Sequence, residues 1–488
     1  MDVGQDGDAQ GRRTLAQSLG AIAFAAAWLG AAAFLWQTEV PSLSLADLDP
    51  RDYFTAAEIE RSEDYRRGAR ALFLGRLAAE LIALAVLVWK ARPLAARLNR
   101  IGRGRVRTAV LLGTSVVVAL WGVGLPFAAA SHVRRVDHGL SEQGWGGWLG
   151  DRALSLGVQV VVVAIAVAGA VWLAGKLGRR WWLAGAPALV AVAVVVVLAQ
   201  PLVIAPLFNR FEPLPDRELA ARVEQLAAGM GVEVDDVLVA DASRRTTTAN
   251  AYVAGIGPTR RVVLYDTLLD GRFTEGEILS VSAHELAHVG ERHLWKGLAW
   301  FALFAIPGVA LLAWITERRG GLADPRLVPL GLAFVFVYVL VTQPLANAVS
   351  RRYEAEADWL AVQATGDPES GVALERRFVT TSLSDPDPPA WVTYWLGTHP
   401  PPLERIAMAE AAAVGAGQES SSGGAPGGPC SGRFRMPSLV DHFDQESVIA
   451  AISSCMNRGD MFTRVTTTPG TSPSSTSWSM RAKVSVNS

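Results

Sequence analysis

The stretch VQVVVVAIAVAGAVWLAG, residues 158–175, decides the fold because it holds no charged side chain. A transmembrane helix needs about 20 mainly apolar residues, and a helix in a soluble protein rarely stays apolar on every face for so long. Seven runs of this kind predict a mainly α-helical multi-pass membrane protein that lies in a lipid bilayer. The runs are residues 16–36, 71–91, 108–130, 153–175, 181–206, 297–316 and 327–346.

The overall composition agrees with a membrane protein and excludes other classes. Half of the 488 residues are hydrophobic, the mean hydropathy is +0.25 and the net charge is −1, so no nucleic-acid partner is predicted. Both cysteines, Cys430 and Cys455, lie near the C-terminus, so neither a disulfide framework nor a thiolate metal site is predicted. The first apolar run lacks a small-residue cleavage site after AAAFLWQTEV, and we interpret it as a retained helix.

The hydrophilic loop 207–296, between the fifth and sixth runs, is predicted to form a small α+β unit. DRELAARVEQLAAGMGV has the apolar spacing of a helix, whereas VDDVLVAD, TTTANAYVAG and RRVVLYDTLL indicate short strands. Thr274 and Glu277 have the T-x-x-E spacing of a capping box, which predicts that a new helix starts there.

That helix carries three of the seven histidines of the chain, in SAHELAHVGERH. His284, Glu285 and His288 form an H-E-x-x-H motif, in which the two imidazoles lie one turn apart on one helix face and can bind one zinc ion. Zinc lowers the pKa of a bound water, and the Glu285 carboxylate can accept the proton as that water attacks a carbonyl. His293 follows His288 by five residues, about 140° further round a continuous helix, and we leave it out of the ligand set.

A catalytic zinc ion takes three protein ligands and keeps one open position, so the third ligand must come from another element. After the seventh run, NAVSRRYEAEADWLA aligns Asn347, Arg351, Glu354 and Asp358 along one helical stripe. Glu354 is the predicted third ligand, and Asp358 is predicted to hydrogen-bond a ligand histidine or Glu354. Glu356 points off this stripe and is the weaker candidate. The alternative is a solvated charged face just outside a membrane helix.

The two motifs together resemble the CAAX prenyl proteases of the zinc type, a family of membrane metalloendopeptidases. In that family H-E-x-x-H is followed by N-x-x-S-R-x-x-E-x-x-A-D, and NAVSRRYEAEAD matches every specified position. The resemblance covers about residues 15–412 and includes ANAYVAG and THPPPLERI, although ANAYVAG alone would be a weak signal. Ala287 stands where the family often has glycine, and we expect no conflict from so small a residue.

The resemblance implies one zinc ion per chain and roles for further residues. Asn347 and Arg351 are expected to support the centre. Asn250, Ala251 and Tyr252 would lie on an edge strand where an extended peptide could add main-chain hydrogen bonds. His399 would donate to the oxyanion of the tetrahedral intermediate, and Arg405 would assist it. The alternatives are an ordinary sheet strand and a surface loop histidine.

These expectations divide the chain into membrane and peptidase regions. Residues 1–206 would hold five transmembrane helices, 207–296 a small zinc metalloprotease domain and 297–346 two further transmembrane helices. Residues 347–411 would complete the peptidase and supply the third ligand. From residue 412 the composition becomes rich in Gly, Ser and Pro, and we predict a disordered tail to residue 488.

The leading function is hydrolysis of peptide bonds in peptide or protein substrates, lipidated or not. One alternative is a quality-control protease that degrades damaged membrane proteins, and seven helices argue against it because such relatives usually have fewer. The other is a catalytically silent membrane scaffold or transporter, against which the intact Glu285 argues. No residue of the sequence identifies an isoprenoid pocket.

The side of the membrane that the metal site faces is predicted differently by two arguments. With seven spans, the basic segment KARPLAARLNRIGRGRVR lies on the side opposite the loop 207–296, and the positive-inside rule makes that basic side cytoplasmic. The family resemblance implies that the metal domain itself faces the cytosol. We favour the cytoplasmic side for the metal site, because an active site recessed among helices constrains topology more than loop charge does.

Overall fold

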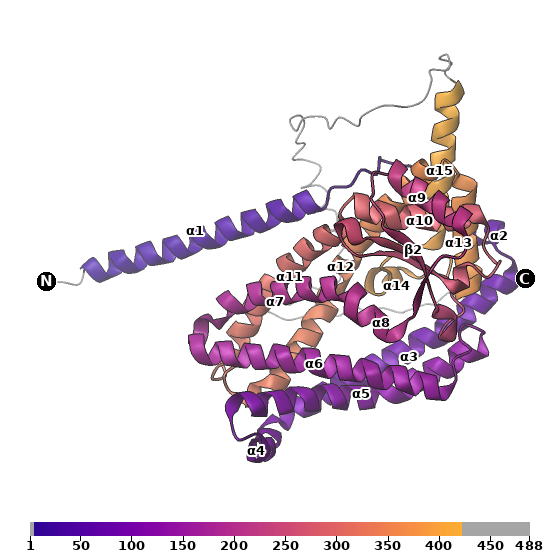
Figure 1. Ribbon diagram of the computed structural model, residues 1–488. Coiled ribbons are helices and arrows are strands. Elements are labelled where there is room, and N and C mark those ends of the chain that lie inside the picture. Colours follow the sequence, from indigo (N-terminus) through magenta and orange to yellow (C-terminus); the bar gives the residue numbers. More distant parts are fainter. Residues whose placement is uncertain (1–3, 422–488) are drawn as a thin grey trace, which may run out of the picture. The chain divides into compact units, whose positions relative to one another are not determined.

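The protein is described here by a computed structural model, which covers residues 4–421 (Figure 1). Within these residues, six stretches are long and apolar enough to cross a membrane. One of them, Trp145–Ala199, contains two helices separated by a 3₁₀ turn at Gly178–Arg180. Each of the seven predicted runs thus lies mainly on one long helix of a multi-pass membrane protein. These helices are α1 Gly4–Leu35, α3 Ala56–Trp89, α5 Arg105–Asp137, α6 Trp145–Leu177, α7 Trp181–Ala199, α11 His293–Glu317 and α12 Val328–Thr365. The fifth run, 181–206, extends past α7 through a π-helical turn at Gln200–Ile204.

The membrane helices pack through both small and large apolar residues, and many large apolar side chains point outward. A Cβ atom added at Gly113 of α5 would lie 3.0 Å from Val167 of α6, so the two backbones approach closely at this glycine. Ile165 exposes 62% and Val341 66% of their surfaces. Many other large apolar side chains on these helices are exposed as well. Such exposure is unfavourable in water but stable against lipid tails.

The part of the chain that carries the hydrophilic loop 207–296 is built on one four-stranded sheet within residues 4–421, in the order β1-β2-β4-β3. β2 and β4 are parallel, whereas β1 and β3 are antiparallel to their neighbours and form the two edges. The strands are β1 Phe211–Pro213, β2 Asp236–Ala240, β3 Ala251–Ala254 and β4 Arg261–Tyr265. The three predicted strands are present, and β1 is a short addition that the sequence analysis did not predict.

Two helices of the loop 207–296 pack with the sheet around a common core that includes Val223, Leu264 and Leu286. They are α9 Arg217–Gly229 and α10 Glu275–Gly290. The predicted capping box is present at the start of α10. The Thr274 N–H donates to Glu277 Oε2 at 2.6 Å, and the Glu277 N–H donates to Thr274 Oγ1 at 3.3 Å. This start fixes which residues of α10 reach the face that lies against α12.

One prediction about α10 is wrong. The helix does not continue to His293, because it ends at Gly290 and Arg292 adopts the left-handed conformation with φ of 57°. His293 is the first residue of α11, so the angle of about 140° from His288, which assumed one continuous helix, does not apply.

Helix α12 joins the membrane region to the part of the chain that contains the sheet. Its first half is the apolar seventh run, and its second half packs along α10 and carries NAVSRRYEAEAD. The remaining helices are α2 Pro50–Tyr53, α4 Ala91–Gly102, α8 Ala205–Phe208, α13 Pro368–Ser382, α14 Ala390–Trp395 and α15 Pro402–Ser421. Helix α15 continues past residue 412, where the tail was predicted to begin, and the alanines at 412, 413 and 416 favour helix there. The predicted tail from residue 422 lies outside the described residues.

Candidate metal centre

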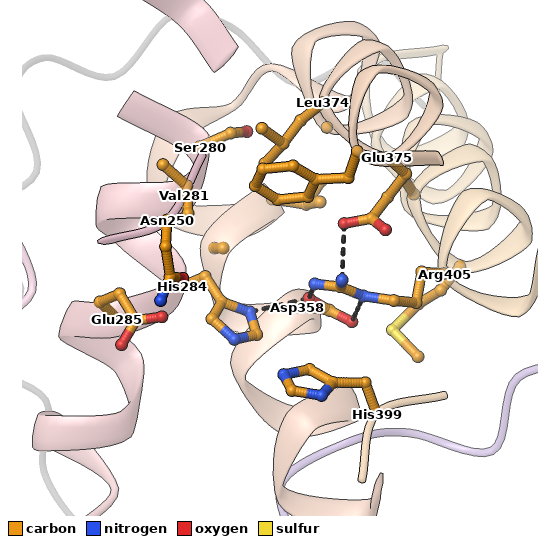
Figure 2. Close-up of a pocket in the computed structure, with 16 residues that line it drawn as sticks. Asn250, Ser280, Val281, His284, Glu285, Asp358, Leu374, Glu375, His399 and Arg405 are labelled. Atoms are coloured by element: carbon orange, nitrogen blue, oxygen red, sulfur yellow. Dashed lines mark hydrogen bonds and ion pairs between the residues drawn. The ribbon is translucent and has the colours of Figure 1, made fainter. Parts of the chain in front are cut away.

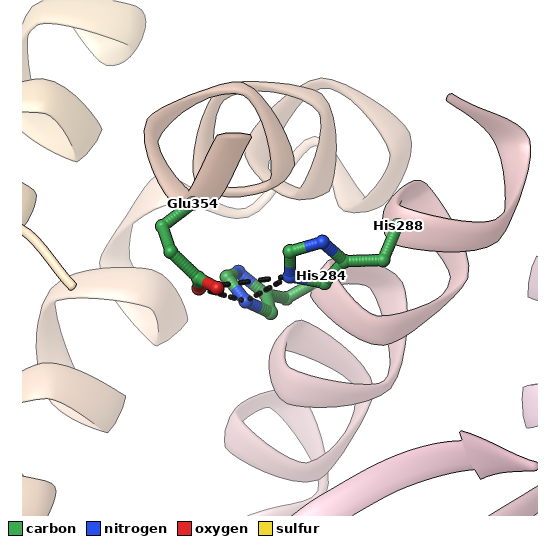
Figure 3. A group of neighbouring side chains, drawn as sticks. All are labelled: His284, His288 and Glu354. Carbon is green, nitrogen blue, oxygen red and sulfur yellow. Dashed lines mark hydrogen bonds and ion pairs between the residues drawn. The ribbon is translucent and has the colours of Figure 1, made fainter. Parts of the chain in front are cut away.

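Three side chains from two helices bring their donor atoms to one point (Figure 3). Helix α10 supplies His284 and His288, one turn apart, and α12 supplies Glu354. His284 Nε2 lies 3.0 Å from His288 Nε2 and 3.1 Å from Glu354 Oε2, and His288 Nε2 lies 3.6 Å from the same oxygen. The three ligand atoms thus lie within 4.8 Å of one another, close enough to share one ion. These are the three residues that the sequence analysis selected as ligands.

The other ring nitrogen of His284 is held by a carboxylate. Its Nδ1 lies 2.8 Å from Asp358 Oδ1, and a carboxylate can only accept, so Nδ1 carries the proton and Nε2 presents its lone pair. Arg405 in turn donates from Nε to Asp358 Oδ2 at 2.7 Å and pairs through Nη1 with Glu375 Oε1 at 2.8 Å (Figure 2). Asp358 therefore orients His284, and Arg405 orients Asp358.

The charged groups behind His284 are largely buried, and one guanidinium pairs with two carboxylates. Burial lowers the pKa of Arg405, but the carboxylates of Asp358 and Glu375 more than offset this and hold that pKa above its ordinary value. Burial raises the pKa of Glu375 despite the opposing charge of Arg405. The family resemblance implied that Arg405 assists His399 at the oxyanion. Its contacts instead assign Arg405 a positioning role behind Asp358. Nothing in the sequence indicated that Glu375 pairs with Arg405.

Glu285 lies beside the ligands and faces the same cavity as His399. Asn250, from the residue just before β3, also lines this cavity (Figure 2). Burial raises the pKa of the Glu285 carboxyl, and Glu354 adds to the shift while His284 and His288 oppose it. A carboxyl with a raised pKa next to a metal site has the properties of a general base.

His399 reaches the centre from the loop between α14 and α15. Its Nε2 lies 3.1 Å from Glu354 Oε2, although its side chain is still about half exposed (54%). Two predicted supporting residues on α12 hold the segment that leads to it. Arg351 Nη1 donates to the carbonyl oxygens of Thr393 and Gly397 at 2.6 and 2.8 Å, and Asn347 Nδ2 donates to that of Tyr394 at 3.2 Å.

The predicted substrate strand occupies an edge of the sheet. β3 pairs only with β4 among the strands of the described residues, and it packs against α10. Ala251 is buried, whereas the ring of Tyr252 meets that of Tyr265 edge to face with centroids 6.3 Å apart. The outer main chain of β3 is thus free of a neighbouring strand near Asn250 and Glu285.

His293, which was left out of the predicted ligand set, contacts His288, and Glu356, the weaker candidate for the third ligand, lies behind His293. His288 Nδ1 is 2.8 Å from His293 Nδ1, and His293 Nε2 is 2.9 Å from Glu356 Oε2. Sequence spacing gave no sign of this contact because it depends on the break between α10 and α11.

The donor set fits a divalent metal ion with a preference for nitrogen and oxygen. Two imidazole nitrogens and one carboxylate oxygen converge, and the far nitrogen of each imidazole has its own partner. Within residues 4–421, no thiol can join this set, because both cysteines lie outside that range. Zinc sites of hydrolytic enzymes have this composition, with a fourth position for water or substrate.

Comparisons with known proteins match the two halves of the chain separately. Residues 213–413 match the family described as peptidase family M48, and residues 39–210 match the CAAX prenyl protease N-terminal region with five membrane helices. A protein of Bacillus subtilis described as the uncharacterized metalloprotease YhfN is 31% identical over 298 residues, which cover 59% of this chain and 70% of that protein. A rice CAAX prenyl protease 1 homolog is 32% identical over 237 residues, 45% of this chain and 53% of the relative.

The fold also resembles a solved structure. The crystal structure of Ste24p from S. mikatae aligns with a TM-score of 0.65 at 22% identity, and the alignment covers 78% of this chain and 96% of that one. At this identity the similarity concerns the fold.

Proposed function

Because the chain belongs to peptidase family M48 and is a membrane metalloendopeptidase related to the CAAX prenyl proteases, we propose that it cleaves peptide bonds with one zinc ion held by His284, His288 and Glu354. The observation that carries this assignment is the convergence of the two Nε2 atoms and Glu354 Oε2 within 4.8 Å. Glu285 and His399 border the same point, so the groups needed for hydrolysis are present beside the ligands.

When bound, zinc would act as a Lewis acid that polarises the scissile carbonyl and acidifies water. Glu285 would accept the proton of the attacking water and pass it to the leaving amide nitrogen. His399 would donate a hydrogen bond to the oxygen on which negative charge develops. Asp358 and Arg405 would keep the His284 ring in place, and Arg351 would keep the loop of His399 in place.

Replacing His399 by alanine is expected to lower kcat on the order of 10²-fold, as the loss of one oxyanion donor does, and to leave zinc bound. The measurement is steady-state cleavage of a fluorogenic peptide together with the zinc content of the purified variant. His138→Ala is the control, since His138 lies at the end of α5 and pairs with Asp64. An unchanged kcat would mean that His399 is an ordinary loop histidine.

The proposed substrate is an extended peptide that pairs with the free edge of β3 around Asn250, Ala251 and Tyr252. Main-chain pairing fixes the peptide without reading its side chains, which suits an endopeptidase that accepts varied sequences. Whether a lipid on the substrate contributes is tested by mass spectrometry of the products from a peptide panel with and without a C-terminal isoprenoid.

Faster cleavage of the lipidated peptides would support processing of lipidated tails. Equal cleavage of both sets, together with degradation of unfolded membrane proteins, would support the quality-control alternative. Absence of cleavage of every peptide by zinc-loaded protein would refute the enzymatic proposal.

We further propose that the metal centre faces the cytoplasm, as the family resemblance implies. The loop 207–296 lies at the same end of the helices as the link between α5 and α6, since Thr247 Oγ1 donates to the carbonyl of Gly139 at 2.7 Å. The arginine-rich helix α4 belongs to the opposite end, where it packs against the segment that precedes α12. The positive-inside rule would place that basic end in the cytoplasm, so a direct measurement of topology is needed.

Cysteine labelling from outside intact cells is that measurement. After Cys430 and Cys455 are replaced by serine, Ala96→Cys in α4 and Asp235→Cys before β2 provide one exposed probe at each end. The proposal predicts labelling at position 96 and none at position 235. The reverse pattern would place the metal centre outside the cytoplasm.

A further inference from the structure

We propose that His293 and Glu356 are positioning residues that fix the metal ligand His288 through a chain of hydrogen bonds. The inference rests on the proposed function, because it takes His288 as a metal ligand. It adds two residues that neither the motif H-E-x-x-H nor the stripe on α12 contains, and it assigns a task to a fully buried carboxylate that the proposed reaction does not otherwise use.

The first link joins the two imidazoles. His288 Nδ1 and His293 Nδ1 are 2.8 Å apart, and the rings meet edge to face with centroids 4.9 Å apart. A hydrogen bond between two ring nitrogens needs a proton on one and a lone pair on the other. The second link decides which nitrogen carries it.

That second link runs from His293 to Glu356. His293 Nε2 lies 2.9 Å from Glu356 Oε2, and the carboxylate accepts, so the His293 proton resides on Nε2. His293 Nδ1 is then the acceptor, and His288 must donate from its own Nδ1. The lone pair of His288 Nε2 therefore points towards Glu354 and His284, which is the tautomer that a metal ion requires.

The buried Glu356 carboxylate has both hydrogen-bond donors and a nearby cation. Its Oε1 accepts the main-chain N–H of Glu39 at 2.5 Å, and Lys296 Nζ lies 3.7 Å from its Oε2. The Tyr353 ring stacks on His293 with centroids 4.6 Å apart and planes inclined by 10°. A buried charge with several donors and one nearby cation is stable, whereas an unpaired one would be costly.

The same region receives the chain as it leaves α1. Tyr353 Oη donates to the carbonyl of Leu35, and Arg352 Nε donates to that of Trp36, both at 2.5 Å. Because residues 352, 353 and 356 surround the ligand Glu354 in sequence, the segment after α1 packs against the ligand-bearing turn of α12. The support of His288 is thus built from α10, α11, α12 and the exit of α1.

Each ligand histidine then has a carboxylate behind it, but by a different route. Asp358 contacts His284 directly, whereas Glu356 reaches His288 through a second imidazole. Loss of such supporting partners typically weakens metal affinity or activity by about 10–100-fold. We expect loss of His293 to weaken metal affinity by a similar factor, although His293 is not itself a metal ligand.

The test compares two replacements of His293 in the full-length protein in detergent. His293→Leu fills the space without hydrogen bonds, and His293→Gln retains one acceptor and one donor. Zinc affinity is measured by competition with a chromophoric chelator, and the visible spectrum of bound cobalt reports the geometry of the ligands. Thermal unfolding of the metal-free proteins checks that each variant folds, and His138→Ala serves as the matched control.

The proposal predicts zinc binding weakened by about 10–100-fold in His293→Leu, an altered cobalt spectrum, and affinity within a few-fold of the parent in His293→Gln. Glu356→Gln, which keeps the shape but removes the charge, should also weaken binding. Parental affinity in both His293→Leu and Glu356→Gln would overturn the proposal, as would equal losses in His293→Leu and His293→Gln. A parent protein that binds no zinc would instead refute the proposed function.

Discussion

Replacing Glu285 by glutamine is expected to abolish measurable peptide hydrolysis while one zinc ion stays bound. Glutamine has nearly the shape of glutamate but cannot accept the proton of the attacking water, and general base catalysis contributes about 10²–10⁴-fold to rates. The ligands His284 and His288 lie on either side of Glu285 along α10 and are not altered, so the metal site should persist. Cleavage rate and zinc content are measured on the same preparation.

A second glutamate of α10 provides the matched control. Glu275 stands at the start of the helix and pairs with Arg222 on the surface. Glu275→Gln should keep both zinc and activity. If Glu285→Gln cleaved peptides at the parental rate, another group would have to serve as the base, and the assignment of the reaction to this motif would be lost.

Replacing Glu354 by alanine is expected to remove the metal and with it the activity. Glu354 supplies the oxygen that completes the donor set, and its loss leaves two histidines of one helix. The affinity should therefore fall by more than the roughly 10–100-fold that loss of a supporting partner costs. Zinc content after dialysis and chelator competition measure the effect.

Glu224→Ala, an exposed glutamate on α9, is the control for the substitution itself. Parental zinc affinity in Glu354→Ala would contradict the proposed donor set. The two neighbouring carboxylates are poorly placed to replace Glu354 as a metal ligand. Asp358 is hydrogen-bonded to His284 and Arg405, and Glu356 is hydrogen-bonded to His293.

The features that follow from local periodicity could be predicted from the sequence. Apolar runs define the membrane helices, and spacing along a helix placed His284 and His288 on one face of α10 and Asn347, Arg351, Glu354 and Asp358 on one stripe of α12. The structure brings these two faces together, so the predicted ligands converge. The resemblance supplied His399, which no spacing argument could have connected to α12.

The support behind His288 could not be predicted because it depends on where a helix ends. The left-handed residue Arg292 breaks the chain between α10 and α11 and turns His293 back towards His288. Glu356 lies off the ligand stripe, on a side of α12 that reaches His293 only because α11 packs against α12. Strand β1 was missed for a simpler reason, since three residues ending in proline show no alternation.

X-ray absorption at the zinc edge of the purified, zinc-loaded protein tests the central claim most directly, because it reports the donor atoms around the metal. The account predicts a four-coordinate site with two imidazole nitrogens at about 2.0–2.1 Å and oxygen donors at similar distances, from Glu354 and from water or substrate. Glu354→Ala should lose this spectrum. A site containing sulfur at about 2.3 Å, which would have to come from Cys430 or Cys455, or a site closed by a fourth protein ligand, would contradict it.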